Sequence, residues 1–375
     1  MVQKYLLIIL SSIFLFACSS GKARLEKGQY DMAVYKAVKR LQQKPNHKKA
    51  SRVLQQAYSL AVDYHMDNIR SYDIGHDGDK WEHMASEYEQ IDYLNTVIRR
   101  YPEYSNLVQL VDVREELAST RLEASKEHVA RGLMFMEQGD KASARLAYEE
   151  FARADYFVAG DENIIQKMFE AREAGTVNIA IEFPSREMNS AFVPTQDLYF
   201  EIQNYAKSLN FQFLRFIDID HPYYQLDEII QLQFDDLIIG NVYMDRSQEH
   251  IIKDNVLLGE EQINDSTVVQ VRGKVSADFR TFMKTIDSRA VLAMHRIDAR
   301  TGETIMRQRF PTNFNWVGQW ATYQGDSRAL TNEQLNMAKL DEPINPSRAW
   351  IFAQLCRPLF DNTAQSINRQ FAFLR

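Results

Sequence analysis

The sequence has little cysteine, glycine and proline, and no apolar run that approaches the ~20 residues of a membrane-spanning helix. Its 375 residues include 2 Cys, 14 Gly and 9 Pro. Long Pro, Gly or Ser tracts are also missing, so we expect the body of the chain to be folded rather than disordered. With 45% apolar residues, the chain can bury one large core or, as usual domain sizes favour, two.

Motifs that mark common catalytic sites are missing too: a nucleophile elbow, a phosphate-binding Gly loop, a Cys-x-x-Cys pair and His-Glu-x-x-His. The nearest candidate is Asp218, Asp220 and His221, which follow a predicted strand where α/β folds often place functional groups. These residues could serve a metal-dependent hydrolase, but a polar loop is the simpler interpretation. A second polar cluster, between residues 64 and 83, fits no metal-ligand spacing. We therefore expect a protein that is not an enzyme and has no cofactor and no metal.

The first residues have the layout of a secretory signal. Lys4 supplies the positive charge, and residues 5–16 form an apolar stretch that only two serines interrupt. This stretch is too short to span a bilayer and is better interpreted as a leader, residues 1–17. It ends in Leu15-Phe16-Ala17-Cys18, which resembles the bacterial lipobox, although the position of Phe16 usually holds a smaller residue. An uncleaved leader or ordinary secretion is the alternative.

The lipobox resemblance implies that Cys18 carries a diacylglycerol and an amide-linked acyl chain. Several acyl chains together hold a protein on a membrane, whereas one chain does so only marginally. In such lipoproteins an Asp after the Cys commonly signals inner-membrane retention; here Ser19 takes that place. The resemblance therefore favours the outer membrane.

The number of cysteines and the net charge limit the bonds and the partners that we expect. With Cys18 lipidated no disulfide can form within the chain, and Cys356, among apolar residues, is expected to be a plain buried thiol. Removing residues 1–17 takes away one positive charge and leaves a formal charge of −8. That sign argues against nucleic acid and against electrostatic docking to anionic lipid. Envelope proteins, of unspecified identity, are the expected partners.

Residues 18–174 are predicted to be helical, because apolar residues recur every three or four positions and helix-favouring types dominate. Two stretches resemble tetratricopeptide repeats. The first begins at Gly28-Gln29-Tyr30. In the second, Gly132, Ala144 and Phe151 fall at the small and large packing positions, around a turn at Gly139-Asp140. Small residues let neighbouring helices approach, and stacked hairpins share one core.

Residues 175–312 are predicted to form a three-layer α/β domain with a mixed sheet. We expect strands at 177–183, 211–217, 236–243, 268–286, 289–297 and 303–310, with helices at 196–209 and 226–234. Asp298 and Gly302 suit a tight hairpin turn between the last two strands.

Two short signatures in this region resemble a periplasmic α/β domain. They are Asp236-Leu237-Ile238-Ile239-Gly240 and Ile297-Asp298-Ala299-Arg300-Thr301-Gly302-Glu303. The domain is shared by the curli secretion lipoprotein, the amino-terminal part of the Tol-system propeller protein and the lipoprotein activators of peptidoglycan synthases. The resemblance covers residues 176–312. The secretion member has membrane-inserting hairpins, but five charged residues between 253 and 265 here argue against a pore.

Residues 313–375 are predicted to be an aromatic-rich helical extension that packs on the α/β domain. Asn345-Pro346 is typical of a helix start, and Pro358 should kink or restart that helix. Trp316, Trp320 and Trp350 lie in this extension; they belong to the core or, alternatively, to a docking patch for a partner. The sequence thus predicts an α+β multidomain lipoprotein that acts as an interaction scaffold in envelope assembly or secretion.

Overall fold

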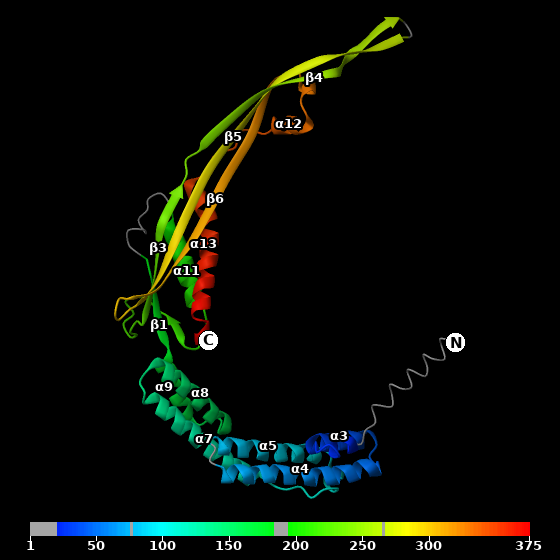
Figure 1. Cartoon of the computed structure of the whole chain (residues 1–375), viewed down its shortest axis with the longest axis vertical. Coiled ribbons are helices and arrows are strands. Elements are labelled where there is room, and N and C mark those ends of the chain that lie inside the picture. Colours follow the sequence, from blue (N-terminus) through cyan, green and yellow to red (C-terminus); the bar gives the residue numbers. More distant parts are fainter. Residues whose placement is uncertain (1–20, 76–77, 184–193, 265–266) are drawn as a thin grey trace, which may run out of the picture. The chain divides into compact units, whose positions relative to one another are not determined.

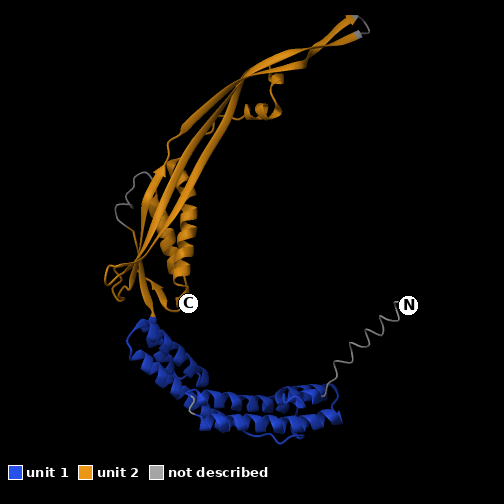
Figure 2. Cartoon of the chain, in the orientation of Figure 1, with its two compact units in different colours: residues 1–175 blue, residues 176–375 orange. Residues whose placement is uncertain are grey.

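The computed structural model describes residues 21–75, 78–183, 194–264 and 267–375. The chain divides into two compact units, residues 1–175 and 176–375 (Figure 2). The first is helical, and the second joins a six-stranded mixed sheet to helices (Figure 1). The predicted α+β multidomain fold is therefore confirmed.

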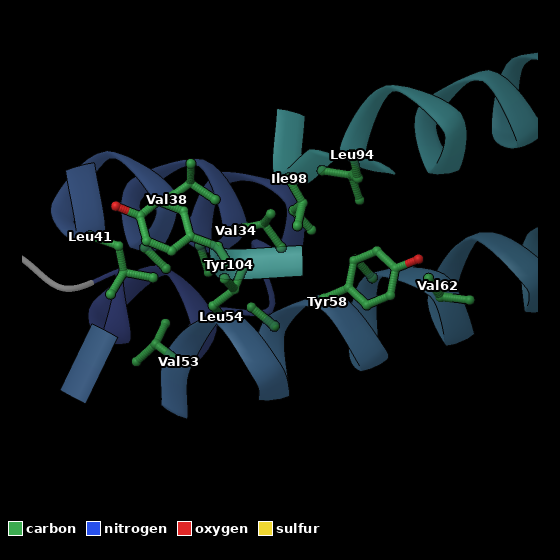
Figure 3. Close-up of a cluster of buried hydrophobic side chains, with 14 of the residues drawn as sticks. Val34, Val38, Leu41, Val53, Leu54, Tyr58, Val62, Leu94, Ile98 and Tyr104 are labelled. Carbon is green, nitrogen blue, oxygen red and sulfur yellow. The ribbon is translucent and has the colours of Figure 1, made fainter. Parts of the chain in front are cut away.

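Unit 1 is a series of antiparallel helix hairpins, in which each helix contacts the next long helix of the chain. Its helices are α2 (Lys22–Leu25), α3 (Tyr30–Gln43), α4 (Lys48–Ile74), α5 (Lys80–Arg99), α6 (Pro102–Ser105), α7 (Arg114–Met136), α8 (Lys141–Phe157) and α9 (Glu162–Gly175). Apolar side chains of α3, α4 and α5 form the larger core, which Figure 3 shows in close-up. A second cluster joins α7, α8 and α9.

The second repeat-like stretch packs as its residues predict. Gly132 of α7 faces Phe151 of α8 so closely that an added Cβ would lie 2.4 Å from the ring. Gly139 has a positive φ of 73°, which L side chains rarely adopt, and the Asp140 carboxylate accepts hydrogen bonds from the N–H groups of Ala142 and Ser143. The glycine therefore ends one helix and the aspartate begins the next.

Unit 2 has the strand order β2-β1-β3-β5-β4, and β6 pairs with the other side of β5. The strands are β1 (Val177–Glu182), β2 (Leu214–Phe216), β3 (Glu228–Ile239), β4 (Tyr243–Asn264), β5 (Thr267–Asp298) and β6 (Thr304–Gly325). The other elements are α11 (Thr195–Ser208), α12 (Asn332–Met337), α13 (Arg348–Gln370) and two short 3-10 turns, η2 (Ser327–Ala329) and η3 (Ala372–Leu374). Strands β2, β1 and β3 run parallel, and the remaining pairs are antiparallel.

Several predicted elements of this unit were wrong. Residues 228–239 form strand β3 rather than a helix at 226–234, and β5 is one strand where two were expected. Residues 243–264 form β4, although no strand was expected between residues 244 and 267. Strand β6 continues to Gly325, so Trp316 and Trp320 lie in the sheet and not in a helical extension. Helix α13 passes through Pro358 without a break.

The two long helices of unit 2 cover the same face of the sheet. Phe234 of β3 contacts Tyr199 of α11 and Phe352 of α13, and the two helices also contact each other. The odd-numbered side chains of β6 between Arg307 and Gln319 lie on the opposite face and are exposed. Along this part of β6 the sheet is therefore covered on one face only.

Both signatures behind the α/β resemblance mark tight backbone geometry. A Cβ on Gly240 would lie 2.2 Å from the carbonyl oxygen of Asp287, so the end of β3 approaches β5 too closely for a side chain. At the β5–β6 turn, Asp298 accepts hydrogen bonds from the N–H groups of Arg300 and Thr301, and Gly302 has φ 75°. The predicted hairpin turn is confirmed.

Candidate interaction surfaces

A segment of unit 1 outside its helices, residues 107–113, packs against the core of α4 and α5 and is held there by buried polar side chains. The Tyr58 hydroxyl accepts a hydrogen bond from Val111 N–H at 2.8 Å and donates one to Asn95 Oδ1 at 2.6 Å. The Asn95 amide donates to the Val111 carbonyl oxygen at 2.7 Å. Side chains from two helices thus bind both backbone groups of one residue that lies outside the helices.

The burial of Tyr58 and Asn95 makes their hydrogen bonds to each other and to Val111 more important for stability. Tyr58 is 3% exposed and Asn95 is fully buried, so each needs its partner to offset the loss of water. Burial raises the pKa of Tyr58, although the hydrogen bond from Val111 acts in the opposite direction. The phenol therefore stays neutral and keeps the proton that it donates to Asn95.

A hollow of about 670 Å³ lies beside the segment. One wall is residues 107–112, and the other is α4, with the exposed Gln55, Ser59 and Asp63 spaced one helical turn apart. Within the part of the chain that the structure describes, the backbone N–H and C=O groups of Val108, Gln109 and Leu110 make no hydrogen bond. This wall therefore has unpaired backbone groups at three successive residues.

The three candidate tryptophans do not form one patch. Trp316 packs in the core with Ile351 and Phe352, and Trp320 is 8% exposed, its ring stacked on Phe282 at 5.0 Å. Only Trp350, which touches Phe314 edge-on, is exposed, at 45%. The structure thus leaves one of the three available to a partner.

Trp320 and Lys284 lie together on one face of the sheet, where residues that follow α12 cover them. Lys284 of β5, 6% exposed, places Nζ 5.3 Å from the Trp320 ring centroid, 2.5 Å from Glu342 Oε1 and 3.2 Å from the Pro343 carbonyl oxygen. Glu342 and Pro343 belong to residues 338–347, here called the strap. Met337, just before the strap, packs with Phe279 on the opposite face. The strap therefore crosses from one face to the other, past Gly318.

Asp218, Asp220 and His221 follow β2 as predicted but do not converge on one point. The Asp218 carboxylate accepts from Lys207 Nζ at 2.7 Å, whereas the His221 ring lies on Tyr224 with centroids 4.9 Å apart. Among the described residues, no group of three or more His, Cys, Asp or Glu side chains could hold a metal ion. The second polar cluster is also divided: His65 is buried within α4, and residues 76–77 lie outside the described residues.

Tyr58 and Asn95 were not recognised from the sequence. The available signal was Asn95 itself, a polar residue in an apolar stripe with Ile91, Leu94 and Ile98, all fully buried. A buried amide in a helical stripe must have a specific partner, but the sequence does not say that the partner is the backbone of a non-helical segment.

Cys18, the predicted lipid attachment site, lies outside the described residues. In the part of the chain that is described, no helix combines the length and the apolar character needed to cross a membrane. No protein-family model matches the chain, and no curated protein matches it either.

Proposed function

We propose that this protein is a lipid-anchored scaffold of the bacterial envelope that binds an extended segment of a partner protein along residues 107–112. The observation that carries the proposal is the pairing of Val111 with Tyr58 and Asn95. It supports the view that the α4–α5 hairpin can hold the backbone of a non-helical segment. Stacked helix hairpins commonly bind extended segments in this way.

The hollow beside this segment accommodates the partner. A second strand running along Val108, Gln109 and Leu110 would pair with their free backbone groups and place alternate side chains toward Gln55, Ser59 and Asp63. Strand addition of this kind takes its affinity from backbone hydrogen bonds and its specificity from side-chain pockets. The partner is therefore a protein with an accessible, unpaired segment.

The envelope location depends on Cys18. The Leu15-Phe16-Ala17-Cys18 sequence supports acylation of the cysteine, and Ser19 supports transfer to the outer membrane. Mass spectrometry of protein from its native membrane should find an acylated Cys18 as the first residue. An intact Met1 peptide or a free thiol at Cys18 would contradict this part of the proposal.

Site-specific photo-crosslinking in intact cells tests the binding surface. A photoreactive residue at Ser59 is expected to give a discrete cross-linked partner, whereas one at the exposed Arg153 of α8 should not. Tyr58→Phe, which frees Val111 N–H and Asn95, should change the yield at Ser59. Identical products at Ser59 and Arg153, or a yield that Tyr58→Phe leaves unchanged, would overturn the proposal.

A further inference from the structure

The formal charge of the chain is distributed very unevenly. Residues 21–52 contain ten Lys and Arg against two Asp and Glu, a formal charge of +8, although the whole chain carries −7. Residues 53–375 contain 33 basic and 49 acidic side chains, a formal charge of −16. The net charge of the whole chain suggested that anionic lipid would be repelled. That net charge hides the difference between a basic first segment and an acidic remainder.

Four of these basic side chains surround one hollow of about 620 Å³ between α2 and the start of α4. They are Lys22, Lys48, Lys49 and Arg52, with Leu25 and Val53 also lining the hollow. The one acidic residue of the lining, Glu26, is paired with Lys22 at 3.1 Å. Lys48, Lys49 and Arg52 are exposed and have no ion-pair partner within the described ranges of the chain.

This placement is electrostatically unfavourable without an anion. Lys48 and Lys49 are the first two residues of α4, whose first turn contains no acidic residue. The amino end of a helix carries a partial positive charge, so cations there repel both the helix and one another. An external layer of negative charge would relieve this repulsion.

We infer that the face formed by Lys22, Lys48, Lys49 and Arg52 binds the phosphate groups of an anionic phospholipid bilayer. The inference rests on the proposed lipid anchor, because Lys22 follows Cys18 by four residues and would lie close to the membrane surface. The basic face adds a second attachment to the acyl chains, and membrane proteins commonly combine two such signals.

Sedimentation with lipid vesicles tests the basic face separately from acylation. The probe protein is the full mature chain made without a leader and carrying Cys18→Ser, so that it has no lipid. We expect it to sediment with vesicles of phosphatidylcholine and phosphatidylglycerol but not with phosphatidylcholine alone. Binding should disappear at about 1 M salt, where the Debye length is about 3 Å.

The triple variant Lys48→Glu, Lys49→Glu and Arg52→Glu should reduce partitioning by about 100-fold, given roughly fivefold for each basic residue near an anionic surface. Acidic residues favour the first turn of a helix, so this variant is expected to fold, which circular dichroism can check. The control is Arg153→Glu, Lys253→Glu and Arg348→Glu, which changes the charge equally at exposed positions elsewhere and should leave binding intact.

Equal sedimentation with both kinds of vesicle, or unchanged binding by the triple variant, would overturn the inference. Binding to polyglutamate but not to vesicles would overturn it in favour of an acidic protein partner. These results do not depend on Cys18, because the probe protein lacks the cysteine. A failure of acylation in cells would instead overturn the anchor alone.

Discussion

His65 Nδ1 lies 2.5 Å from Glu87 Oε2, and this contact joins α4 to α5 inside unit 1. On the other side of the ring, His65 Nε2 lies 3.2 Å from Asp31 Oδ1 of α3. Ionised carboxylates only accept hydrogen bonds, so both contacts can form together only when both ring nitrogens carry a proton and the imidazole is positively charged. One buried side chain thus joins three helices, and its two acidic neighbours favour the imidazolium cation.

We expect this cation to make the stability of unit 1 depend on pH. Burial opposes protonation of His65, but hydrogen bonds and charges from Asp31 and Glu87 together outweigh it and raise the pKa. The stabilisation is therefore fully present below the unfolded pKa of about 6.5 and is lost as the pH rises through the folded value. His65→Gln should cost about 1–3 kcal/mol at low pH and less at high pH.

Pulse proteolysis over a urea series, with unit 1 fragments identified by mass spectrometry, measures this difference at each pH. His250→Gln is the control, because His250 forms an exposed pair with Asp278 in unit 2. A cost for His65→Gln that is the same at every pH would show that the ring is not charged in the folded protein.

Gly132→Ala should destabilise unit 1, although alanine normally favours a helix over glycine by about 1 kcal/mol. The new methyl group would meet the Phe151 ring at 2.4 Å, and Phe151 is 1% exposed and packed in a buried cluster. Overpacking of this kind costs about 1–3 kcal/mol. The double variant Gly132→Ala with Phe151→Leu should recover part of the loss in urea denaturation. A stabilised single variant would contradict the close contact.

Removal of either partner of the Lys284–Glu342 pair should have unequal effects on the strap. Glu342→Ala leaves the buried Lys284 ammonium without its carboxylate, whereas Lys284→Met keeps the packing against Trp320 and removes the charge. Lys284 is buried and Glu342 is 56% exposed, and leaving a buried charge without its partner costs more than replacing that charge with an apolar group. We expect faster proteolysis within residues 338–347 for Glu342→Ala than for Lys284→Met. The reverse order would mean that the ion pair does not hold the strap.

Cys356 should alkylate slowly. Burial, with smaller contributions from Glu201 and Asp197, raises the pKa of its thiol to about 12. At pH 8 the thiolate fraction is then roughly 2000-fold lower than that of an ordinary thiol with a pKa near 8.5. Iodoacetamide labelling of the Cys18→Ser protein, read by mass spectrometry, should be slow until urea unfolds the chain. Rapid labelling of the folded protein would contradict this environment.

The helical half could be predicted because its residues carry their own pattern. The apolar spacing predicts the helices, and Gly139 and Asp140 predict the turn between two of them, each from neighbouring residues alone. The small size of Gly132 predicts that another helix approaches closely there. Residues 228–234 were misassigned because their apolar residues fit both periods, and only pairing with β5 selects the strand. The sequence of strand β4 has no alternation of buried apolar and exposed polar residues, because most of its side chains are exposed on both faces.

Pro311 explains the early end predicted for β6. A proline normally ends a central strand, but β6 is an edge strand and pairs only with β5, so the missing N–H group can face outward.

The Val111 pairing could not be foreseen for another reason. It joins three residues far apart in the chain, and the only local trace was one buried asparagine.

Only part of the hairpin of β4 and β5 is paired with a third strand. Strand β6 reaches only to Ala277 of β5, so residues 267–275 pair with β4 alone. A ribbon of two strands is at best marginally stable in water without a packed face. The far end of this arm should therefore open and close independently of the rest of unit 2, at a small fraction of the free energy needed to unfold it.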